Sequence, residues 1–329
     1  MNNYKKIGLT ALAASLVSVS AQAGSMSVSG SASMGLEHIN GGAANSGKSF
    51  SMGNQLTFTG GGELDNGLNV SLSFVIDQGD DTTTNVGSGT LKFGGGAPFD
   101  SHSITISSDA LGSIKMSGEG GSSASSAVDG MVSGDIWDAF QAAADEPEAA
   151  PAGSNGLYYT LPSMVDGVAI AASYAPKGTG YESSTAFNIV YSGIDGLTLT
   201  YASGDDNSTD GSQADHTVMK VSYAYGPVTV GYSESEYDDE VASGDQSTEA
   251  YSVAYTVSDE ISISYGSEEL EFGVQSATNV AAEFERVKIS YTAGGMTLTA
   301  SQSTGDNVSY STAATEDREV WALGASFAF

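Results

Sequence analysis

Residues 42–49 read Gly-Ala-Ala-Asn-Ser-Gly-Lys-Ser, which fits the phosphate-binding pattern G-x-x-x-x-G-K-S. That pattern binds phosphate only between a buried strand and the start of a helix. Here alternating segments with only one apolar face lie on both sides of it. We therefore interpret the match as a coincidence in a loop rich in glycine and serine.

Asp206, Ser208 and Asp210, followed by Gly211, match the first half of a calcium loop, D-x-S-x-D-G. The glutamate expected at the twelfth position is absent, because Thr217 stands there. A complete helix–loop–helix calcium site is therefore excluded. A weak calcium site among loop carboxylates stays open, with a solvated loop as its alternative, and no other cofactor is expected.

Residues that could catalyse a reaction form no recognisable set. His38, His102 and His216 lack the mutual spacing of a metal site or a catalytic triad, so we expect each of them in a solvated or rim position. With 40 acidic residues, pairs of carboxylates carry no information about acid–base catalysis. Cysteine is absent, which excludes thiolate metal sites. We expect no enzymatic activity.

The elements that must position these residues are strands, because apolar and polar residues alternate through almost the whole chain. The segments from Leu68 to Ile76 and from Glu319 to Phe329 are clear examples. We count sixteen such segments, an even number, as expected for a barrel whose ends meet on one side. One face is apolar, and the other carries small hydroxyl groups. A soluble sandwich would instead bury large apolar groups at a core.

The connections between these segments alternate between short and long. Short ones contain pairs typical of tight reversals, such as Asn66-Gly67, Asp195-Gly196 and Gly226-Pro227. Long polar connections lie near 39–50, 78–98, 120–155, 204–215, 237–247, 270–283 and 304–318. We predict an all-β fold, a transmembrane antiparallel β-barrel of 16 strands, with short periplasmic turns and long extracellular loops.

The first residues have the organisation of a secretory signal peptide. Lys5 and Lys6 precede an apolar stretch, and Ala21-Gln22-Ala23 forms a small-x-small cleavage site. We predict a signal peptide at 1–23 and a single barrel domain at 24–329. The formal net charge of −30 excludes nucleic acid as a partner, because the chain would repel its phosphates.

Several stretches resemble general bacterial outer-membrane porins, closest to the trimeric 16-stranded porins of alphaproteobacteria (Rhodobacter-type). They are Gly112-Ser113-Ile114-Lys115-Met116, Tyr158 to Ser163 with Asp166-Gly167 after it, and the terminal Phe329. The resemblance implies a homotrimer in the outer membrane beside lipopolysaccharide, with a third extracellular loop that folds into the barrel. It also implies that the barrel-assembly machinery reads the chain terminus, Phe329 with Phe327.

The predicted third loop, 120–155, has residues suited to narrowing a pore. Asp135 could cap a short helix whose residues Ile136, Trp137 and Phe140 pin the loop to the inner wall. The carboxylates that would then face the pore are Asp129, Asp135, Asp138, Asp145, Glu146 and Glu148. Carboxylates around a narrow channel favour cations. A solvated outer loop is the alternative.

Basic residues on the predicted inner face are few and dispersed along the chain: Lys115, Lys220, Arg286 and Lys288. The porins that the chain resembles usually carry a basic cluster on the wall facing the third loop, but the first three segments have no inward lysine or arginine. We therefore expect a weak or displaced transverse field and a preference for cations. The predicted function is passive diffusion of small hydrophilic solutes and ions. A substrate-selective porin and, in another class, a surface adhesin or structural β-protein stay open.

Overall fold

The computed structural model describes residues 24–41, 47–77, 100–140, 147–150, 155–176, 182–209 and 212–329. The predicted signal peptide, 1–23, lies outside these residues. Within the described ranges, no helix has the length and apolar character needed to cross a bilayer.

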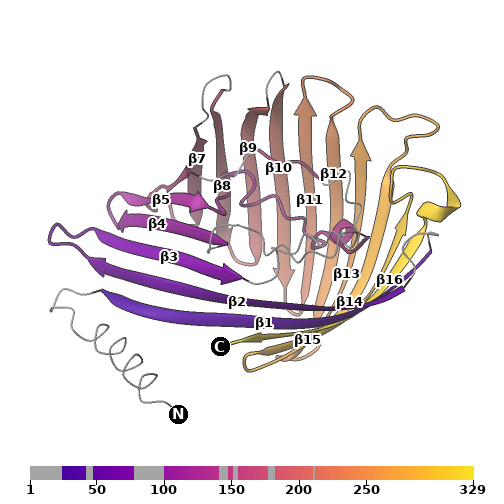
Figure 1. Ribbon diagram of the computed structural model, residues 1–329, viewed down its shortest axis with the longest axis horizontal. Coiled ribbons are helices and arrows are strands. Elements are labelled where there is room, and N and C mark those ends of the chain that lie inside the picture. Colours follow the sequence, from indigo (N-terminus) through magenta and orange to yellow (C-terminus); the bar gives the residue numbers. More distant parts are fainter. Residues whose placement is uncertain are drawn as a thin grey trace, which may run out of the picture.

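The described residues form sixteen strands and two short 3₁₀ helices (Figure 1). The first eight strands are β1 Ser25–Asn40, β2 Gly47–Glu63, β3 Asn69–Asp77, β4 Ser101–Ser108, β5 Gly112–Glu119, β6 Gly156–Thr160, β7 Val168–Ala175 and β8 Ser184–Ile194. The others are β9 Leu197–Thr209, β10 Ser212–Tyr225, β11 Val228–Asp239, β12 Gln246–Thr256, β13 Ile261–Phe272, β14 Ala282–Ala293, β15 Met296–Asp306 and β16 Arg318–Ala328. The helices are η1 Ile136–Phe140 and η2 Ala314–Glu316.

Each strand pairs antiparallel with its neighbours in sequence, and β16 returns to pair with β1. At this seam Gly30 N donates to Phe329 O over 2.7 Å, and Phe329 N donates to Gly30 O over 3.0 Å. The sheet is therefore a closed barrel without a free edge, which confirms the predicted fold class.

Tight turns on one rim depend on glycine. Their φ angles lie between 57° and 80°, where a side chain would be strained, at Gly67, Gly112, Gly196, Gly226 and Gly294. Four of these five glycines lie beside or in short turns predicted from Asn-Gly, Asp-Gly, Gly-Pro and Gly-Gly pairs, and Gly112 ends the predicted Ala110-Leu111-Gly112 turn. The turns predicted from these residue pairs are therefore present on this rim, with glycine at the positions where φ is positive.

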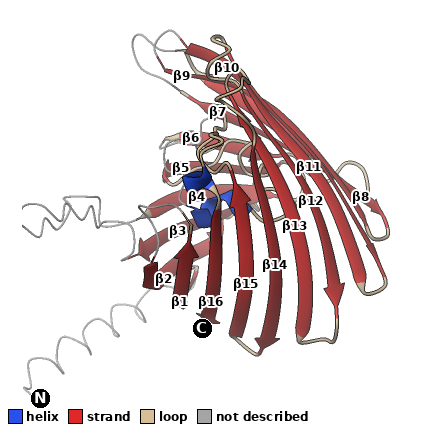
Figure 2. Cartoon of the chain, turned by 90° about the vertical axis from the view of Figure 1, so that its right-hand side faces the viewer, coloured by secondary structure: helices blue, strands red, loops and turns tan. Residues whose placement is uncertain are grey.

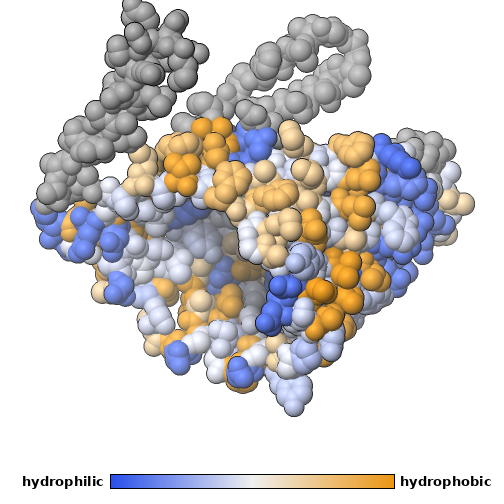
Figure 3. Space-filling view, turned by 90° about the horizontal axis from the view of Figure 1, so that it is seen from below, coloured by the Kyte–Doolittle hydropathy of each residue, from blue (hydrophilic) through white to orange (hydrophobic). Residues whose placement is uncertain are grey.

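The outer face carries the exposed apolar side chains of the alternating segments. On β16, Trp321 is 49% exposed and Leu323 is 57% exposed, whereas Val320, on the inner face, is 2% exposed. Figure 3 shows orange side chains around the outside and a hollow within this face of the molecule. Tyr251 and Trp321 end in hydrogen bonds to the carboxylates of Glu249 and Glu319. Amphipathic rings of this kind suit a lipid–water boundary.

The predicted loop at 204–215 is wrong in extent. β9 continues to Thr209 and β10 begins at Ser212, and the two strands pair across almost the whole predicted loop. Beyond the apolar band both faces of these strands are polar, so the alternation that marks a strand in sequence disappears while the backbone hydrogen bonds continue.

The main buried apolar cluster lies inside the barrel rather than between two sheets. Its residues are Ile136, Phe140, Leu270, Ala282, Phe284, Val308, Tyr310 and Val320. Ile136 and Phe140 come from η1, and the helix packs against β13, β14, β15 and β16 (Figure 2). The barrel therefore has a small core where the β5–β6 connection meets its inner wall.

Candidate functional site

The segment that leaves β5 turns into the lumen and first contacts β7 and β8. Ala124 N donates to Ser173 Oγ over 2.8 Å, and Asn188 Nδ2 donates to Ala124 O over 2.6 Å. His216, fully buried on β10, lies between Ser125 Oγ at 3.0 Å and Ser235 Oγ at 3.1 Å. The expected solvated or rim position of His216 is therefore wrong, since the loop covers its ring.

The middle of the loop is held by side chains of β10, β11 and β14. Val132 N donates to Ser233 Oγ over 3.0 Å. Lys220 Nζ donates to Gly130 O over 2.7 Å. Arg286 Nη2 donates to the carbonyl oxygens of Ser133 and Gly134, both at 2.8 Å. Backbone groups of the loop are thus satisfied by the wall, as burial requires.

A carboxylate of β13 fixes the start of η1. Glu268 is 2% exposed. It accepts hydrogen bonds from Ser133 Oγ over 2.5 Å, Ile136 N over 2.7 Å and Trp137 N over 3.1 Å. Asp135, the residue expected to cap this helix, instead accepts from Met131 N over 2.8 Å. The side chain that accepts hydrogen bonds from the helix N-terminus therefore comes from the wall and not from the loop.

Apolar contacts complete the attachment. Ile136 is fully buried and Phe140 is 2% exposed, and the rings of Phe140 and Phe284 lie 5.2 Å apart between centroids. Arg318 Nη1 donates to Phe140 O over 3.3 Å. The expectation that Ile136, Trp137 and Phe140 pin the loop to the inner wall is confirmed, since Trp137 is partly buried and packs against the same cluster.

Two glycines of the wall make room for the loop. A Cβ added at Gly266 would lie 2.9 Å from Ser133 Cβ, and one added at Gly231 would lie 3.0 Å from Val132 Cβ. Any side chain at either position would push the loop away from the wall. The described part of the 120–155 connection thus folds into the barrel, as predicted; in Figure 1 it crosses the face of β9 to β13.

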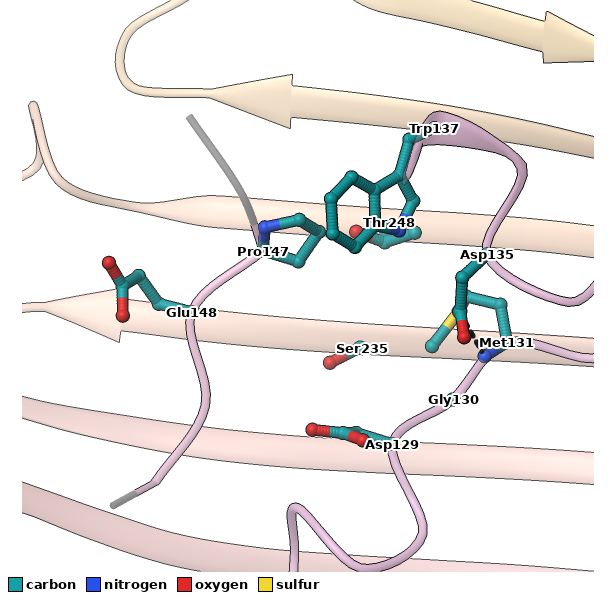
Figure 4. A pocket seen from close by; sticks show the side chains of 9 residues that line it. All are labelled: Asp129, Gly130, Met131, Asp135, Trp137, Pro147, Glu148, Ser235 and Thr248. Atoms are coloured by element: carbon teal, nitrogen blue, oxygen red, sulfur yellow. Dashed lines mark hydrogen bonds between the residues drawn. The ribbon is translucent and has the colours of Figure 1, made fainter. Parts of the chain in front are cut away.

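Three of the predicted acidic residues line one cavity of about 120 Å³ between two limbs of the loop and the wall (Figure 4). Asp129 and Asp135 come from one limb and Glu148 from the other. Ser235 of β11 and Thr248 of β12 line the wall side, and the ring of Trp137 extends toward Pro147. Neither lysine nor arginine lines this cavity among the described residues.

Burial raises the pKa of Asp129 from 3.8 to about 6, with a further contribution from the neighbouring Asp135 charge. The ammonium of Lys220 acts in the opposite direction but does not cancel the shift. The charge of this cavity therefore changes close to neutral pH.

The remaining predicted charges lie in different places. Asp138 is exposed on η1. Asp145 and Glu146 lie outside the described residues. Lys115 faces the lumen from β5, opposite Tyr158 of β6. Lys220 and Arg286, 66 positions apart in the numbering, line one cavity on the other side of the loop segment 132–133, and Lys288 follows Arg286 on the same face of β14.

Two of the three candidate calcium residues, Asp206 and Ser208, belong to β9 rather than to a loop. Asp206 is 8% exposed and accepts a hydrogen bond from Tyr237 Oη over 2.9 Å. Asp210 lies outside the described residues. At the chain terminus, Phe327 pairs with Ala32, and the ring of Phe329 lies where a side chain of Gly30 would be.

Sequence reasoning missed Glu268, the residue with the most contacts to the start of η1. Its signal was present, because Ser262 and Ser264 already assign even positions of this segment to the inner face. Three glutamates within 268–271 concealed it, since a run of acids suggests an outer loop.

A family model described as "Gram-negative porin" matches residues 8–292. No curated protein matches the chain by sequence. Among solved structures, an anion-selective porin from Comamonas acidovorans is 16% identical with a TM-score of 0.67, covering 93% of this chain and 100% of its own. OmpT of Vibrio cholerae in its trimer form is 13% identical with a TM-score of 0.66, at the same coverages. A mutant of the Rh. blastica porin is 16% identical with a TM-score of 0.63, again covering 93% and 100%.

Proposed function

The chain belongs to the Gram-negative porin family, and from this premise we propose that it is a general diffusion porin of the bacterial outer membrane. Small hydrophilic solutes and ions would cross passively through its water-filled lumen. The observation that carries this proposal is the loop held inside a closed barrel by Glu268, Arg286 and the cluster around Phe140. Family and fold point to a channel rather than to an enzyme.

Planar-bilayer recording of the purified full chain tests the proposal. A channel gives discrete conductance steps, whereas a surface adhesin or structural β-protein gives none. A general porin conducts in proportion to bulk salt concentration, while a substrate-selective porin shows saturation and block by its solute. Absence of steps from correctly folded protein rejects the channel.

The preference for cations is part of the proposal. Asp129, Asp135 and Glu148 give the cavity in the loop a negative lining. The inner faces of β1, β2 and β3 carry mainly serine, threonine and glycine, with carboxylates at Glu37, Glu63 and Asp77. They have no lysine or arginine at the inward positions of their described residues. Carboxylates without a facing basic cluster attract cations. A reversal potential of anionic sign across a salt gradient would contradict this.

Assembly into a homotrimer is proposed from the same family. The OmpT structure from Vibrio cholerae is described as a trimer form, at 13% identity to this chain. Trimers inserted into a bilayer would produce conductance steps in groups of three, and chemical cross-linking in detergent would stop at the trimer. A monomeric cross-linking pattern would reject this assembly.

Delivery to the membrane is proposed to use the signal peptide at 1–23 and the terminal Phe329. The outer face with Trp321 and Leu323 would lie in outer-membrane lipid, beside lipopolysaccharide. Removing Phe329 should reduce the amount of assembled barrel far more than it changes the conductance of the channels that form, because the barrel-assembly machinery would no longer recognise the terminus. Equal yields of wild type and deletion would refute its role as an assembly signal.

Calcium binding near Asp206, Ser208 and Asp210 stays a weaker proposal. Thermal unfolding in added calcium and in chelator tests it, because a bound ion stabilises only the folded state. Identical unfolding temperatures in both would remove calcium as a ligand.

A further inference from the structure

A second cavity lies on the side of the loop that faces the short turns, with a volume of about 360 Å³. Val132 and Ser133 of the loop form one side, and strands β9 to β14 form the other. Thr198, Thr229 and Ala254 line it within two residues of strand ends at the short turns. Its volume is at the lower end of the range of roughly 300–1,000 Å³ for small-molecule pockets.

Two positive charges line this cavity, Lys220 and Arg286, and no carboxylate does so among the described residues. Within the same residues the ion pair that the structure contains is Arg318 with Glu316, elsewhere in the barrel. Both cations are bonded to loop carbonyl oxygens, which carry no full charge. In a chain with 40 acidic and 10 basic residues, two lumen cations that form no ion pair within the described residues are unexpected.

Both side chains keep donors for a ligand. Arginine has five N–H groups and lysine has three. Lys220 donates one hydrogen bond to Gly130 O, and Arg286 uses its Nη2 atom for both of its bonds to the loop. Lys288, two residues after Arg286 on the same face of β14, adds a third positive charge nearby.

Hydroxyl groups form most of the remaining polar lining. They belong to Thr198, Thr200, Ser222, Thr229, Ser252 and Ser264. Hydroxyl groups both donate and accept, so they can bind the oxygen atoms of an anion or the hydroxyl groups of a sugar. Together with the two cations, these hydroxyl groups are complementary to a small solute that has both an oxyanion group and hydroxyl groups.

We propose that this cavity is a binding site for the oxyanion group, phosphate or carboxylate, of a small hydroxylated solute. Arg286 and Lys220 bind the oxyanion, and the hydroxyl groups bind the rest of the solute. Asp129 and Asp135 attract Lys220 from the other side of the loop, which leaves Arg286 and Lys288 as the cations of this wall without such an opposing charge from the described part of the loop. The lumen then has separate negative and positive sites on the two sides of one loop.

Binding requires no permeation, so the site is tested apart from the proposed channel activity. The full chain is folded in a phosphate-free detergent, and inorganic phosphate is titrated at constant ionic strength while its ³¹P line width is recorded. We expect saturable broadening that potassium gluconate reverses and that equimolar chloride does not. Absence of saturable broadening, or equal reversal by chloride, overturns the proposal.

Variants locate the binding without releasing the loop. Lys288→Gln removes no hydrogen bond to the loop and should weaken binding by up to about fivefold, the effect of removing one unit charge at about 4 Å in water. Ser222→Leu keeps every cation but fills the cavity, and should abolish the broadening. Lys115→Gln removes the same charge from β5, outside the cavity, and should leave phosphate binding unchanged. If Ser222→Leu binds phosphate like the wild type, the site lies elsewhere.

Discussion

The inner wall of β1–β3 and the inner wall of β10–β14 follow the same alternation but present opposite surfaces. The first carries small hydroxyl groups such as Ser29, Thr57 and Ser73. The second carries buried groups that bind the loop, among them Glu268, Ser233 and Phe284. The alternation along each strand determines which side chains point inward. Whether those side chains meet water or the loop determines their size and polarity.

Among substitutions in the wall that binds the loop, loss of Glu268 should have the largest effect on conductance and on the stability of the loop. Glu268→Ala removes three hydrogen bonds to a carboxylate, each worth about 1.5–3 kcal/mol. We expect η1 to leave the wall, with a higher single-channel conductance and faster proteolysis of the loop. Glu269→Ala, next in sequence but on the outer face, is the matched control and should conduct like the wild type.

The aromatic contact of the loop should rank next. Phe140→Ala removes the ring that packs on Phe284 and should destabilise the loop by about 3–5 kcal/mol. Phe58→Ala removes an equally close ring pair, with Phe74, on the outer face of β2 and β3. Limited proteolysis should detect a released loop in the first variant only. Equal cleavage of the two would show that this cluster does not hold the loop.

Charge at the loop should have a smaller effect, visible as a change with pH. Because burial raises the pKa of Asp129 to about 6, this carboxyl is ionised above pH 6 and neutral below it. Cation preference should therefore decrease as pH falls through 6, by up to about fivefold for one charge. Reversal potentials between pH 5 and pH 8 measure the change. Asp129→Asn should remove this step, and a step that persists in the variant belongs to another group.

The same substitution made on each of the two walls compares them directly. Ser233→Ala loses the acceptor of Val132 N and leaves a partly buried N–H unpaired, at a cost of about 1 kcal/mol. Ser73→Ala, on the inner face of β3, should stay within about 0.5 kcal/mol. The unfolding temperature and the rate of loop proteolysis are measured for both variants. Equal losses would mean that the walls do not differ as described.

Much of this architecture could be predicted from the sequence, because a period of two is a local property. The sixteen strands follow from it, and the tight turns follow from the glycine-containing pairs between them. The inward course of the 120–155 connection was instead implied by the resemblance to porins and by the apolar residues of the loop. The extent of β9 and β10 could not be predicted, because both faces are polar where those strands rise above the apolar band.

The contacts of the loop were harder to predict because they join distant segments. Glu268 is 132 positions from Ile136, and no local pattern assigns it to the start of η1. Lys220 on β10 and Arg286 on β14 looked dispersed along the chain, yet the curvature of the sheet brings both to one cavity across the three strands between them. The alternation in the sequence predicts that such side chains point inward, but it does not predict which residues they contact.

The hydrogen bonds between Gly30 and Phe329 have a consequence for how the barrel is made. They join the first strand to the last, so the ring stays open until both ends of the chain have been synthesised and brought together. Closing a loop of nearly the whole chain is entropically costly and slow compared with forming the neighbouring hairpins. Until then two strand edges are exposed, and the nascent protein depends on being shielded from other copies of itself.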